Sequence, residues 1–287
     1  MIIKRLYWWT GKNIGDAISP LIVEWMLGHK VKYGVARTFW KELWVFLRER
    51  IKYRKKYHWS APLPPYKEKV MYAVGSILDN VETNAIIWGS GLGREWSRIH
   101  GRPIICAVRG KYTLRNLPDC YDKTKIAIGD PALLLPLIIP SPNIQISHTV
   151  GIIPHFMDYE IFNKKYGEKY KIIDIRTRNA ETFIKEILQC KYILSTSLHG
   201  IIISHAYNRP ALWIRRLEMN VGDFKFHDYF SSVDIPIYDG FADYNKILTE
   251  TNIPNFFLEH KELAYVSPIT ISKIQKSLIE SFPKENK

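Results

Sequence analysis

The chain has 287 residues, of which 46% are hydrophobic and 24% charged, a composition that is typical of a globular protein and excludes a disordered one. Its net charge of +13 favours anionic partners, such as nucleic acid, phospholipid headgroups or a phosphorylated metabolite. Three cysteines without C-x-x-C spacing argue against a disulfide framework or a zinc site. No apolar run approaches the ~20 residues that span a bilayer, and no signal peptide is visible. We therefore expect a cytoplasmic protein.

Short apolar, β-prone runs, each followed by a glycine-rich or polar turn, recur through the first half of the chain. They cover residues 2–9, 69–74, 85–88, 103–108 and 125–128. A helix is expected to begin near Asp16. Residues 136–143 contain three prolines and a serine, so we interpret them as a linker. Strands that alternate with helices across such turns predict a parallel sheet.

A second series of the same kind follows the linker. Strands are expected at residues 150–153, 171–175, 191–194 and 211–214, with a helix at 180–189 and an amphipathic helix at 271–282. The pattern predicts an α/β protein with two Rossmann-like domains that face a cleft. We expect the domains to cover residues 1–140 and 145–268, followed by a C-terminal helix and tail at 269–287.

Residues 38–59 differ from the rest of the chain. Trp40, Leu43, Trp44, Leu47 and Ile51 can line one face of a helix, and basic residues crowd its end. One interpretation is an interfacial helix on an anionic membrane, which would make the protein peripheral at the inner face of the cytoplasmic membrane. The other is a packing helix whose basic end is solvated, because cations near a helix C-terminus are favourable in any case.

The segment from Lys191 to Tyr229 holds the strongest candidate site. Its apolar strand meets a polar turn that contains Ser195 and Ser197, and then His199 and Gly200 open a segment of helical length. Free N–H groups at a helix start attract anions, and histidine can donate a proton near neutral pH. The alternatives are that His199 only hydrogen-bonds a carbonyl group, and that the serines only form a turn.

Three cations are candidates for binding an anionic substrate. Arg109 ends an apolar strand, and its guanidinium can hold a phosphate or carboxylate through two parallel N–H bonds. Its alternative role is an ion pair with Asp130 or another acid at the sheet edge. Arg215 and Lys225 follow the last predicted strand of the second series.

Polar residues also follow the other predicted strands. Asn13, Gly15 and Asp16 come where the first strand meets the first helix, and Asp16 suits either an N-cap or a general base. Ser90 and Gly91 lie in a loop that is not the dinucleotide fingerprint, because Arg94 stands where the third glycine belongs. Asp130 is expected to cap a helix that begins at Pro131, and His155 can face the cleft.

Several motifs are absent from the sequence: H-E-x-x-H, G-x-x-x-x-G-K-[ST] and G-x-S-x-G. The nine histidines show no metal-ligand spacing. We therefore expect an enzyme without a metal or a cofactor. The hypothesis from another class is a non-catalytic protein that binds nucleic acid or an anionic membrane through its basic and aromatic surface. The absence of a recognised nucleic-acid motif argues against it.

An ordered set of short motifs resembles the polysaccharide pyruvyltransferase family, roughly from Tyr7 to Val233. The motifs are S-x-S-L-H-G-x-I-x-x-x-A-Y-x-x-P at 195–210, G-D-F-K-F-x-D-Y-F at 222–230, N-I-G-D at 13–16, W-G-S-G at 88–91, V-R-G-x-x-T at 108–113, G-D-P-A-L-L at 129–134 and I-P-H-F at 153–156. The resemblance implies a glycosyltransferase-B-like fold and transfer of a pyruvyl group from phosphoenolpyruvate to a sugar, as a ketal. The sugar would belong to a bacterial surface polysaccharide or its lipid-linked precursor.

The resemblance also implies roles for the candidate residues. His199 would protonate phosphoenolpyruvate at C3, and Asp16 would take a proton from the sugar. The donor would be bound by Arg109, Ser195, Ser197, Gly200, Arg215 and Lys225, and the cleft or acceptor side would contain Asn13, Gly15, Ser90, Gly91, Asp130 and His155. The sequence departs from the family at Ser197, where an arginine is usual. The alternative function is a nucleotide-sugar-dependent glycosyltransferase of the same fold.

Overall fold

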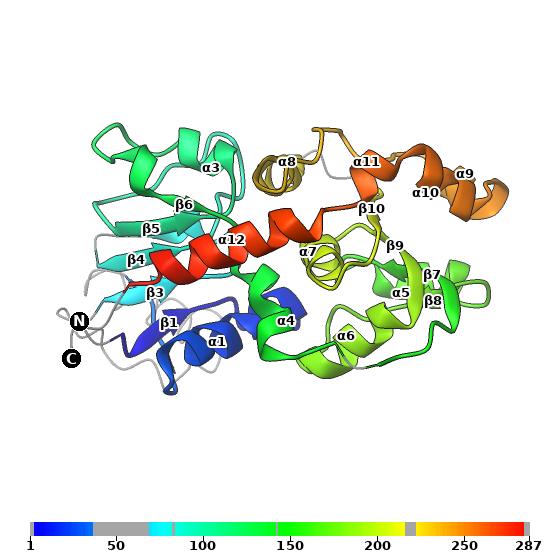
Figure 1. Cartoon of the computed structure of the whole chain (residues 1–287), viewed down its shortest axis with the longest axis horizontal. Helices are drawn as coiled ribbons and strands as arrows, with labels where there is room; N and C mark the ends of the chain where they lie inside the picture. The colour runs from blue at the N-terminus through cyan, green and yellow to red at the C-terminus, as the bar shows by residue number, and fades with distance from the viewer. Residues whose placement is uncertain (1–2, 37–68, 82–83, 142, 216–221, 284–287) are drawn as a thin grey trace, which may run out of the picture.

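A computed structural model describes residues 3–36, 69–81, 84–141, 143–215 and 222–283. The helical segment that the sequence predicts at 38–59 lies outside these residues, and so does its proposed membrane contact. Within the described part, the chain forms two parallel β-sheets with helices around them (Figure 1). The prediction of an α/β protein with parallel sheets is confirmed.

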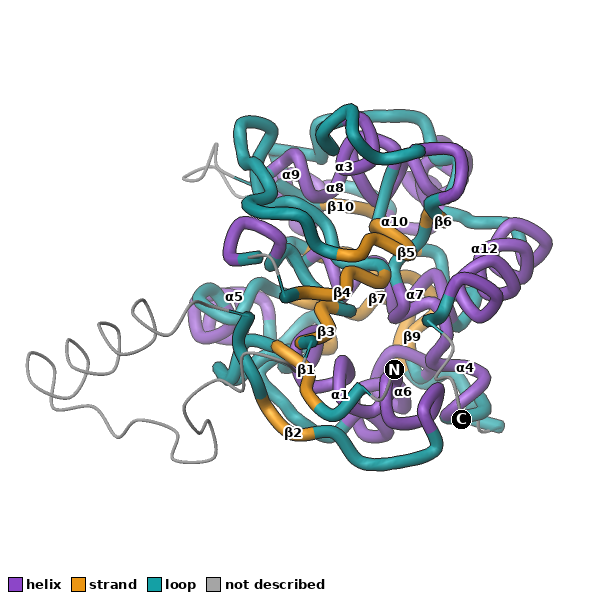
Figure 2. The backbone as a smooth tube through the Cα atoms, turned by 90° about the vertical axis from the view of Figure 1, so that its left-hand side faces the viewer, coloured by secondary structure: helices purple, strands orange, loops and turns teal. Residues whose placement is uncertain are grey.

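The first sheet contains six strands in the order β2-β1-β3-β4-β5-β6, and all its neighbouring strands are parallel. The strands are β1 (Arg5–Tyr7), β2 (Lys32–Tyr33), β3 (Val70–Tyr72), β4 (Ala85–Trp88), β5 (Ile104–Val108) and β6 (Ala127–Ile128). Figure 2 shows them stacked from β6 and β5 at the top to β2 at the bottom. Every side chain of β3 and β4 is buried, as expected of central parallel strands covered on both faces.

The second sheet contains four strands in the order β10-β9-β7-β8, again all parallel. The strands are β7 (His148–Ile153), β8 (Lys171–Ile172), β9 (Cys190–Ser195) and β10 (Ala211–Trp213). All the strands predicted from the sequence are present in the two sheets, mostly shorter than expected. Strand β2 was not predicted, because it has two residues, of which one is exposed and one half-buried.

The helices connect the strands and cover the sheets. They are α1 (Ile14–Leu27), α3 (Lys111–Arg115), α4 (Leu135–Ile138), α5 (Tyr159–Tyr166), α6 (Ala180–Leu188), α7 (Leu198–Ala206), α8 (Asp223–Ser232), α9 (Tyr244–Glu250), α10 (Ile253–Glu259), α11 (Lys261–Ala264) and α12 (Pro268–Ser281), with short 3-10 helices η2 (Leu78–Asn80), η3 (Lys123–Lys125) and η4 (Pro131–Leu134). The segment predicted as a linker, residues 136–143, begins within α4. Pro136 fits there because the first turn of a helix does not need its N–H group.

Helix α12 joins the end of the chain to the first sheet. It crosses the molecule and packs on β5, β6 and η4 (Figure 1). The indole N–H of Trp88 donates a 2.9 Å hydrogen bond to the Leu278 carbonyl oxygen. One buried apolar cluster contains Leu6 of the first sheet, Trp213 of the second and Leu278 of α12. The two halves therefore share a core, and their division into domains facing a cleft stays a prediction.

Candidate functional site

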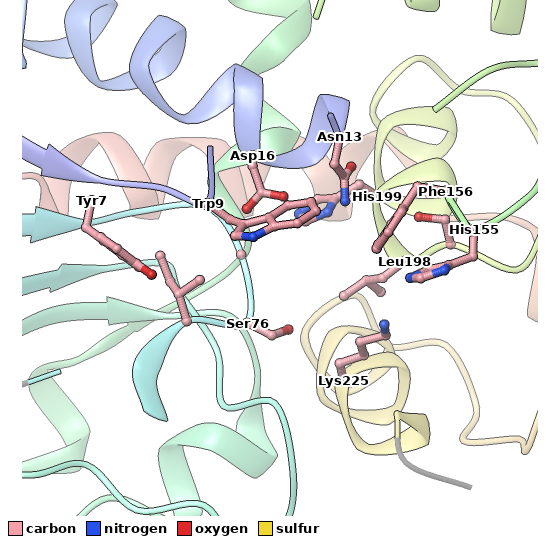
Figure 3. A pocket seen from close by; sticks show the side chains of 13 residues that line it. Tyr7, Trp9, Asn13, Asp16, Ser76, His155, Phe156, Leu198, His199 and Lys225 are labelled. Carbon is pink, nitrogen blue, oxygen red and sulfur yellow. The ribbon is translucent and has the colours of Figure 1, made fainter. Parts of the chain in front are cut away.

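A cavity of about 390 Å³ lies at the carboxyl ends of β1, β3, β7 and β9, between the two sheets. Its walls are Tyr7, Trp9, Asn13, Asp16, Gly75, Ser76, Ile77, His155, Phe156, Ser197, Leu198, His199 and Lys225. Figure 3 shows Asp16 and Trp9 on one side, His155 and Phe156 on another, and Lys225 reaching from α8. Ligands of open parallel sheets bind at this edge, where the loops after the strands meet.

The turn after β9 is fixed by hydrogen bonds from its hydroxyl groups. The Ser195 hydroxyl oxygen lies 2.8 Å from the Ile153 carbonyl oxygen and accepts the Ser197 N–H at 3.0 Å. The Thr196 hydroxyl accepts the His155 N–H at 2.7 Å. Ser195 is fully buried by these contacts and does not reach the cavity, whereas Ser197 lines it. The turn interpretation therefore fits Ser195 better than a donor contact.

Helix α7 points its N-terminus at the cavity. Ser197 is the N-cap in an extended conformation, and its side chain makes no capping hydrogen bond. The first N–H groups of a helix have no partner within the helix, so the start of α7 attracts an anion. Gly200 lies behind this surface: a Cβ there would come within 2.4 Å of the Ser195 hydroxyl oxygen and 2.9 Å of Ile153. Gly200 therefore allows close packing rather than contact with a ligand.

His199 is the first histidine of the site. It is buried, and among the described residues its Nε2 has no hydrogen-bond partner. Burial lowers the pKa of the imidazole to about 3, and the positive charges of Arg109 and Lys225 add to this effect. The imidazole is therefore neutral at pH 7. A buried polar atom without a partner is costly, and such atoms are typical of functional sites.

Gly15 sets the position of the His199 ring. A Cβ on Gly15 would lie 2.0 Å from Nδ1 and 2.4 Å from Cγ of the imidazole. Helix α1 is held against this part of the chain by the Ile14 N–H, which donates to the Ile175 carbonyl oxygen at 2.9 Å. The imidazole consequently rests on the backbone of α1.

We expect Gly15→Ala to displace the imidazole while leaving the fold intact. The added methyl group cannot share the space of the ring, but alanine favours the helix by about 1 kcal/mol over glycine. A catalytic group misplaced by about 1 Å can cost roughly 10²-fold in rate. Turnover should fall by about that factor while the circular dichroism spectrum is retained. Wild-type turnover in Gly15→Ala would show that the ring position is unimportant.

Asp16 is the third residue of α1 and not its cap. The cap is Asn13, whose side-chain oxygen accepts the Gly15 N–H at 3.0 Å. The expectation that Asp16 caps the helix is therefore wrong. Burial raises the pKa of the Asp16 carboxyl to about 7, although a hydrogen bond from the Trp9 backbone and the charge of Lys225 act in the opposite direction. Asp16 can thus hold or release a proton near neutral pH.

Gly75 gives Asp16 its space on the opposite wall. It has a φ of +117°, a backbone conformation that side chains other than glycine rarely adopt. A Cβ there would lie 3.6 Å from the Asp16 Oδ1. The turn after β3 therefore approaches the carboxyl group closely.

Lys225 carries the positive charge of the cavity. It is the only lysine or arginine in the cavity wall among the described residues, and it acts on the pKa of both Asp16 and His199. Its helix, α8, lies beside α3 of the first half (Figure 1). The position of Lys225 therefore depends on how α8 is attached.

Arg109 attaches α8 to the first sheet. Its Nε donates to Asp228 Oδ2 at 2.9 Å, and both side chains are fully buried. Its other nitrogens donate to the Ser76 hydroxyl at 2.5 Å and to the Leu92 carbonyl oxygen at 2.8 Å. Asp228 also accepts the backbone N–H and the hydroxyl of Thr113, each at 2.7 Å. This arrangement does not fit Arg109 as a donor ligand, and it matches the alternative of an ion pair with another acid.

The remaining predicted residues divide between the cavity and the interior. Asn13 and His155 line the cavity. Ser90 is fully buried and donates to the Ala73 carbonyl oxygen at 2.6 Å, and Gly91 packs against the Arg109 guanidinium. Asp130 is fully buried as the cap of η4. This confirms the prediction that Asp130 caps a helix, but it does not support a position in the cleft. Arg215 pairs with Asp223 at 2.5 Å, away from the cavity wall.

Sequence reasoning missed the aromatic and loop residues of the wall. Trp9 and Phe156 approach each other with ring centroids 5.4 Å apart, and Trp9 is 42% exposed. Tyr7 and Ser76 complete the side formed by the first sheet. The available signal was positional, since Ser76 and Phe156 each follow the end of a predicted strand and Trp9 is the last residue of one.

No three side chains from histidine, cysteine, aspartate and glutamate are placed together to hold a metal ion in the described part of the chain. Within the same residues, no helix is both long and apolar enough to cross a membrane.

Fold and site together define a parallel α/β protein with an anion-attracting cavity that contains an ionisable pair. The model of the polysaccharide pyruvyl transferase family matches residues 13–217, and the chain belongs to this family. An uncharacterized protein, L143, of Acanthamoeba polyphaga mimivirus is 36% identical over 166 residues, which are 55% of this chain and 58% of the viral protein. The chain therefore matches little more than half the length of that relative. No solved structure matches it significantly.

Proposed function

We propose that the protein transfers a pyruvyl group from phosphoenolpyruvate to a sugar of a glycan, forming a cyclic ketal and releasing phosphate. The observation that carries the proposal is the convergence of an anion site, made by Lys225 and the start of α7, with Asp16 and His199 in one cavity. Family membership supports pyruvyl transfer to a polysaccharide. The cavity volume suits a small metabolite together with one sugar ring.

The anion site supplies what phosphoenolpyruvate needs at its phosphate and carboxylate groups. The Lys225 ammonium, the Ser197 hydroxyl and the first N–H groups of α7 are all donors, and they come from both α7 and α8. Ser197 stands where the family usually has an arginine, and Arg215 is engaged by Asp223. Lys225 therefore provides the cation in this chain.

The environments of Asp16 and His199 favour an exchange of the roles that the family resemblance implied. Asp16, with a pKa of about 7, is partly protonated at neutral pH, whereas His199, with a pKa of about 3, is neutral. A bound anion raises both pKa values, so the proton stays with Asp16. Two groups whose environments separate their pKa values identify an acid and a base. We assign Asp16 as the acid and His199 as the base.

In the first half of the reaction, the Asp16 carboxyl gives its proton to C3 of phosphoenolpyruvate, and the electron pair of the double bond forms the new C–H bond. The resulting oxocarbenium-like C2 is attacked by one sugar hydroxyl. The neutral His199 imidazole takes the proton of that hydroxyl. The product is a tetrahedral adduct that still carries the phosphate group.

In the second half, a neighbouring sugar hydroxyl attacks C2, and the bond between C2 and the phosphate oxygen breaks. The Asp16 carboxylate takes the proton of this hydroxyl, and the His199 imidazolium protonates the leaving phosphate. Both residues return to their starting states. Lys225 and the N-terminus of α7 stabilise the charge that develops on phosphate. The exposed face of Trp9 offers an apolar surface for the sugar ring, so the first sheet forms the acceptor side.

The binding step is tested by thermal unfolding with phosphoenolpyruvate, inorganic phosphate and nucleoside diphosphates. A ligand at about 100 times its Kd stabilises the native state by about 2.7 kcal/mol. We expect phosphoenolpyruvate to raise the midpoint well beyond phosphate, and Lys225→Met to abolish the difference. Stabilisation by a nucleoside diphosphate alone would instead favour a nucleotide-sugar-dependent glycosyltransferase.

A further inference from the structure

A second cavity, of about 270 Å³, lies on the other side of the first turn of α8. Its walls are Gly93, Arg94, Glu95, Trp96, Tyr112, Gly222, Asp223, Phe224 and His227. Nothing in the proposed pyruvyl transfer uses these residues. The sequence motif at 222–230 includes Gly222, Asp223, Phe224 and His227 of this wall, but it suggested no separate site for them.

The two cavities adjoin each other at two places. On one wall, a Cβ added to Gly93 of the second cavity would lie 3.8 Å from the carbonyl oxygen of Ser76, which lines the first. On the other wall, a Cβ added to Gly222 of the second cavity would lie 3.9 Å from the Lys225 Nζ in the first. The cavities are therefore neighbours along α8.

The lining of the second cavity has the chemistry of a carbohydrate site. Trp96 is 65% exposed, and the Arg94 guanidinium lies 5.7 Å from the centroid of one of its rings. The electron-rich face of an indole attracts the C–H groups on the apolar face of a sugar ring. Glu95 and Arg94 can accept and donate hydrogen bonds to sugar hydroxyls.

An anionic donor is a poor fit for the same cavity. Its wall has no excess of positive charge to hold a phosphate, because Glu95 stands beside Arg94 and the Asp223 carboxylate pairs with Arg215. Tyr112 and Phe224, whose rings are 6.2 Å apart, add apolar surface. A neutral, partly apolar ligand suits this combination better.

We propose that the second cavity is a distal subsite for the acceptor, which binds the sugar unit next to the one that receives the pyruvyl group. The inference rests on the proposed function, because it assumes that the reacting sugar occupies the first cavity. A glycan would then pass over the first turn of α8, and Trp96 would select a polymer over a free monosaccharide.

The test is direct binding, which needs no phosphoenolpyruvate and no turnover. Fluorescently labelled wild-type protein is applied to an array of defined mono- to hexasaccharides, beside Trp96→Ala and Trp25→Ala. Trp25 on α1 is also exposed, at 43%, and lies in neither cavity wall, so it is the matched control. We expect wild type and Trp25→Ala to bind at least one oligosaccharide better than its terminal monosaccharide. Trp96→Ala should lose roughly tenfold or more of that preference, the size of one aromatic stacking contact.

Equal binding of oligosaccharides by wild type and Trp96→Ala overturns the subsite, and so does wild-type binding without any preference for length. An equal loss in Trp25→Ala overturns it as well, since the effect would then be general. The outcome is separable from that of the proposed function. A chain that binds oligosaccharides through Trp96 but does not use phosphoenolpyruvate keeps the glycan site and loses only the pyruvyl donor.

Discussion

Replacing Asp16 by asparagine is expected to lower kcat by about 10²- to 10⁴-fold, the usual contribution of a positioned acid. Asparagine has the shape of the carboxyl group and can accept the hydrogen bond of the Trp9 backbone, but it has no proton to give. The measurement is release of phosphate from phosphoenolpyruvate in the presence of acceptor glycan.

The same residue should set the dependence of the wild-type rate on pH. The acid must be protonated, and burial raises its pKa to about 7. We therefore expect kcat/KM to fall above about pH 7 in wild type, because the free enzyme then loses the proton that it must donate. The pKa of His199, about 3, keeps the base neutral throughout this range.

Asp16→Asn should gain stability relative to wild type as the pH rises, although its catalytic rate is lower. The pKa of Asp16 is higher in the folded state than the ordinary value of about 3.9 in the unfolded state, so its contribution is full below about pH 4 and is lost as pH rises through 7. Asparagine has no such loss. Between pH 5 and pH 8, the unfolding midpoint of Asp16→Asn should therefore rise relative to that of wild type.

The control is Asp119→Asn, which removes a fully exposed carboxylate that is distant from Asp16 in the sequence. This change should alter neither the rate nor its pH profile. A kcat within a few-fold of wild type in Asp16→Asn would remove Asp16 from the mechanism. A fall in rate above pH 7 that persists in this variant would assign the titration to another group.

The second large effect is expected from Asp228→Asn, which leaves the Arg109 guanidinium buried without its counter-charge. Breaking a buried ion pair from one side typically costs about 3–5 kcal/mol. At this chain length, each kcal/mol lowers the unfolding midpoint by about 2 °C, so we expect a decrease of roughly 6–10 °C. Calorimetry measures it directly.

Asp234→Asn is the matched control for this change. It removes the partner of Lys111 at the other end of α8, where the two side chains are 56% and 71% exposed. An exposed pair contributes at most about 1 kcal/mol, and asparagine tolerates the positive φ of 58° at this position. Equal destabilisation by the two variants would contradict the view that the Arg109–Asp228 pair anchors α8.

The double variant Arg109→Met with Asp228→Asn separates structure from catalysis. Removing both charges should recover much of the lost stability, because no unpaired buried charge remains. If Arg109 only positions α8 and Lys225, the double variant keeps measurable turnover with a raised KM for phosphoenolpyruvate. Complete loss of donor binding in a stable double variant would restore Arg109 as a direct ligand.

Much of the fold could be predicted because the strands are short apolar runs closed by polar turns. Residues 85–88 were predicted with the bounds that β4 has, and the amphipathic pattern near the C-terminus is α12. The return of α12 across the first sheet could not be predicted. It depends on contacts between distant residues, such as Trp88 and Leu278, that leave no local pattern.

In the candidate site, too, the sequence predicted what depends on neighbouring residues and missed what depends on residues far apart in the chain. Local chemistry identified Asp16, Ser197, His199 and Lys225, because each follows a strand or opens a helix, and the structure brings all four to one cavity. It could not tell which polar residues would be buried against each other. Arg109 was expected to face a ligand because its partner, Asp228, is 119 residues away.

The central claim, pyruvyl transfer from phosphoenolpyruvate, is tested most directly by running the reaction in deuterated water. The acceptor is the surface polysaccharide of the organism that encodes the protein, after mild acid has removed existing ketals. We expect one deuterium in the methyl group of each new ketal, because C3 receives a single proton from the solvent-exchanged Asp16, with one phosphate released per ketal. Phosphate found on the sugar, or release of pyruvate without any ketal, would contradict the account.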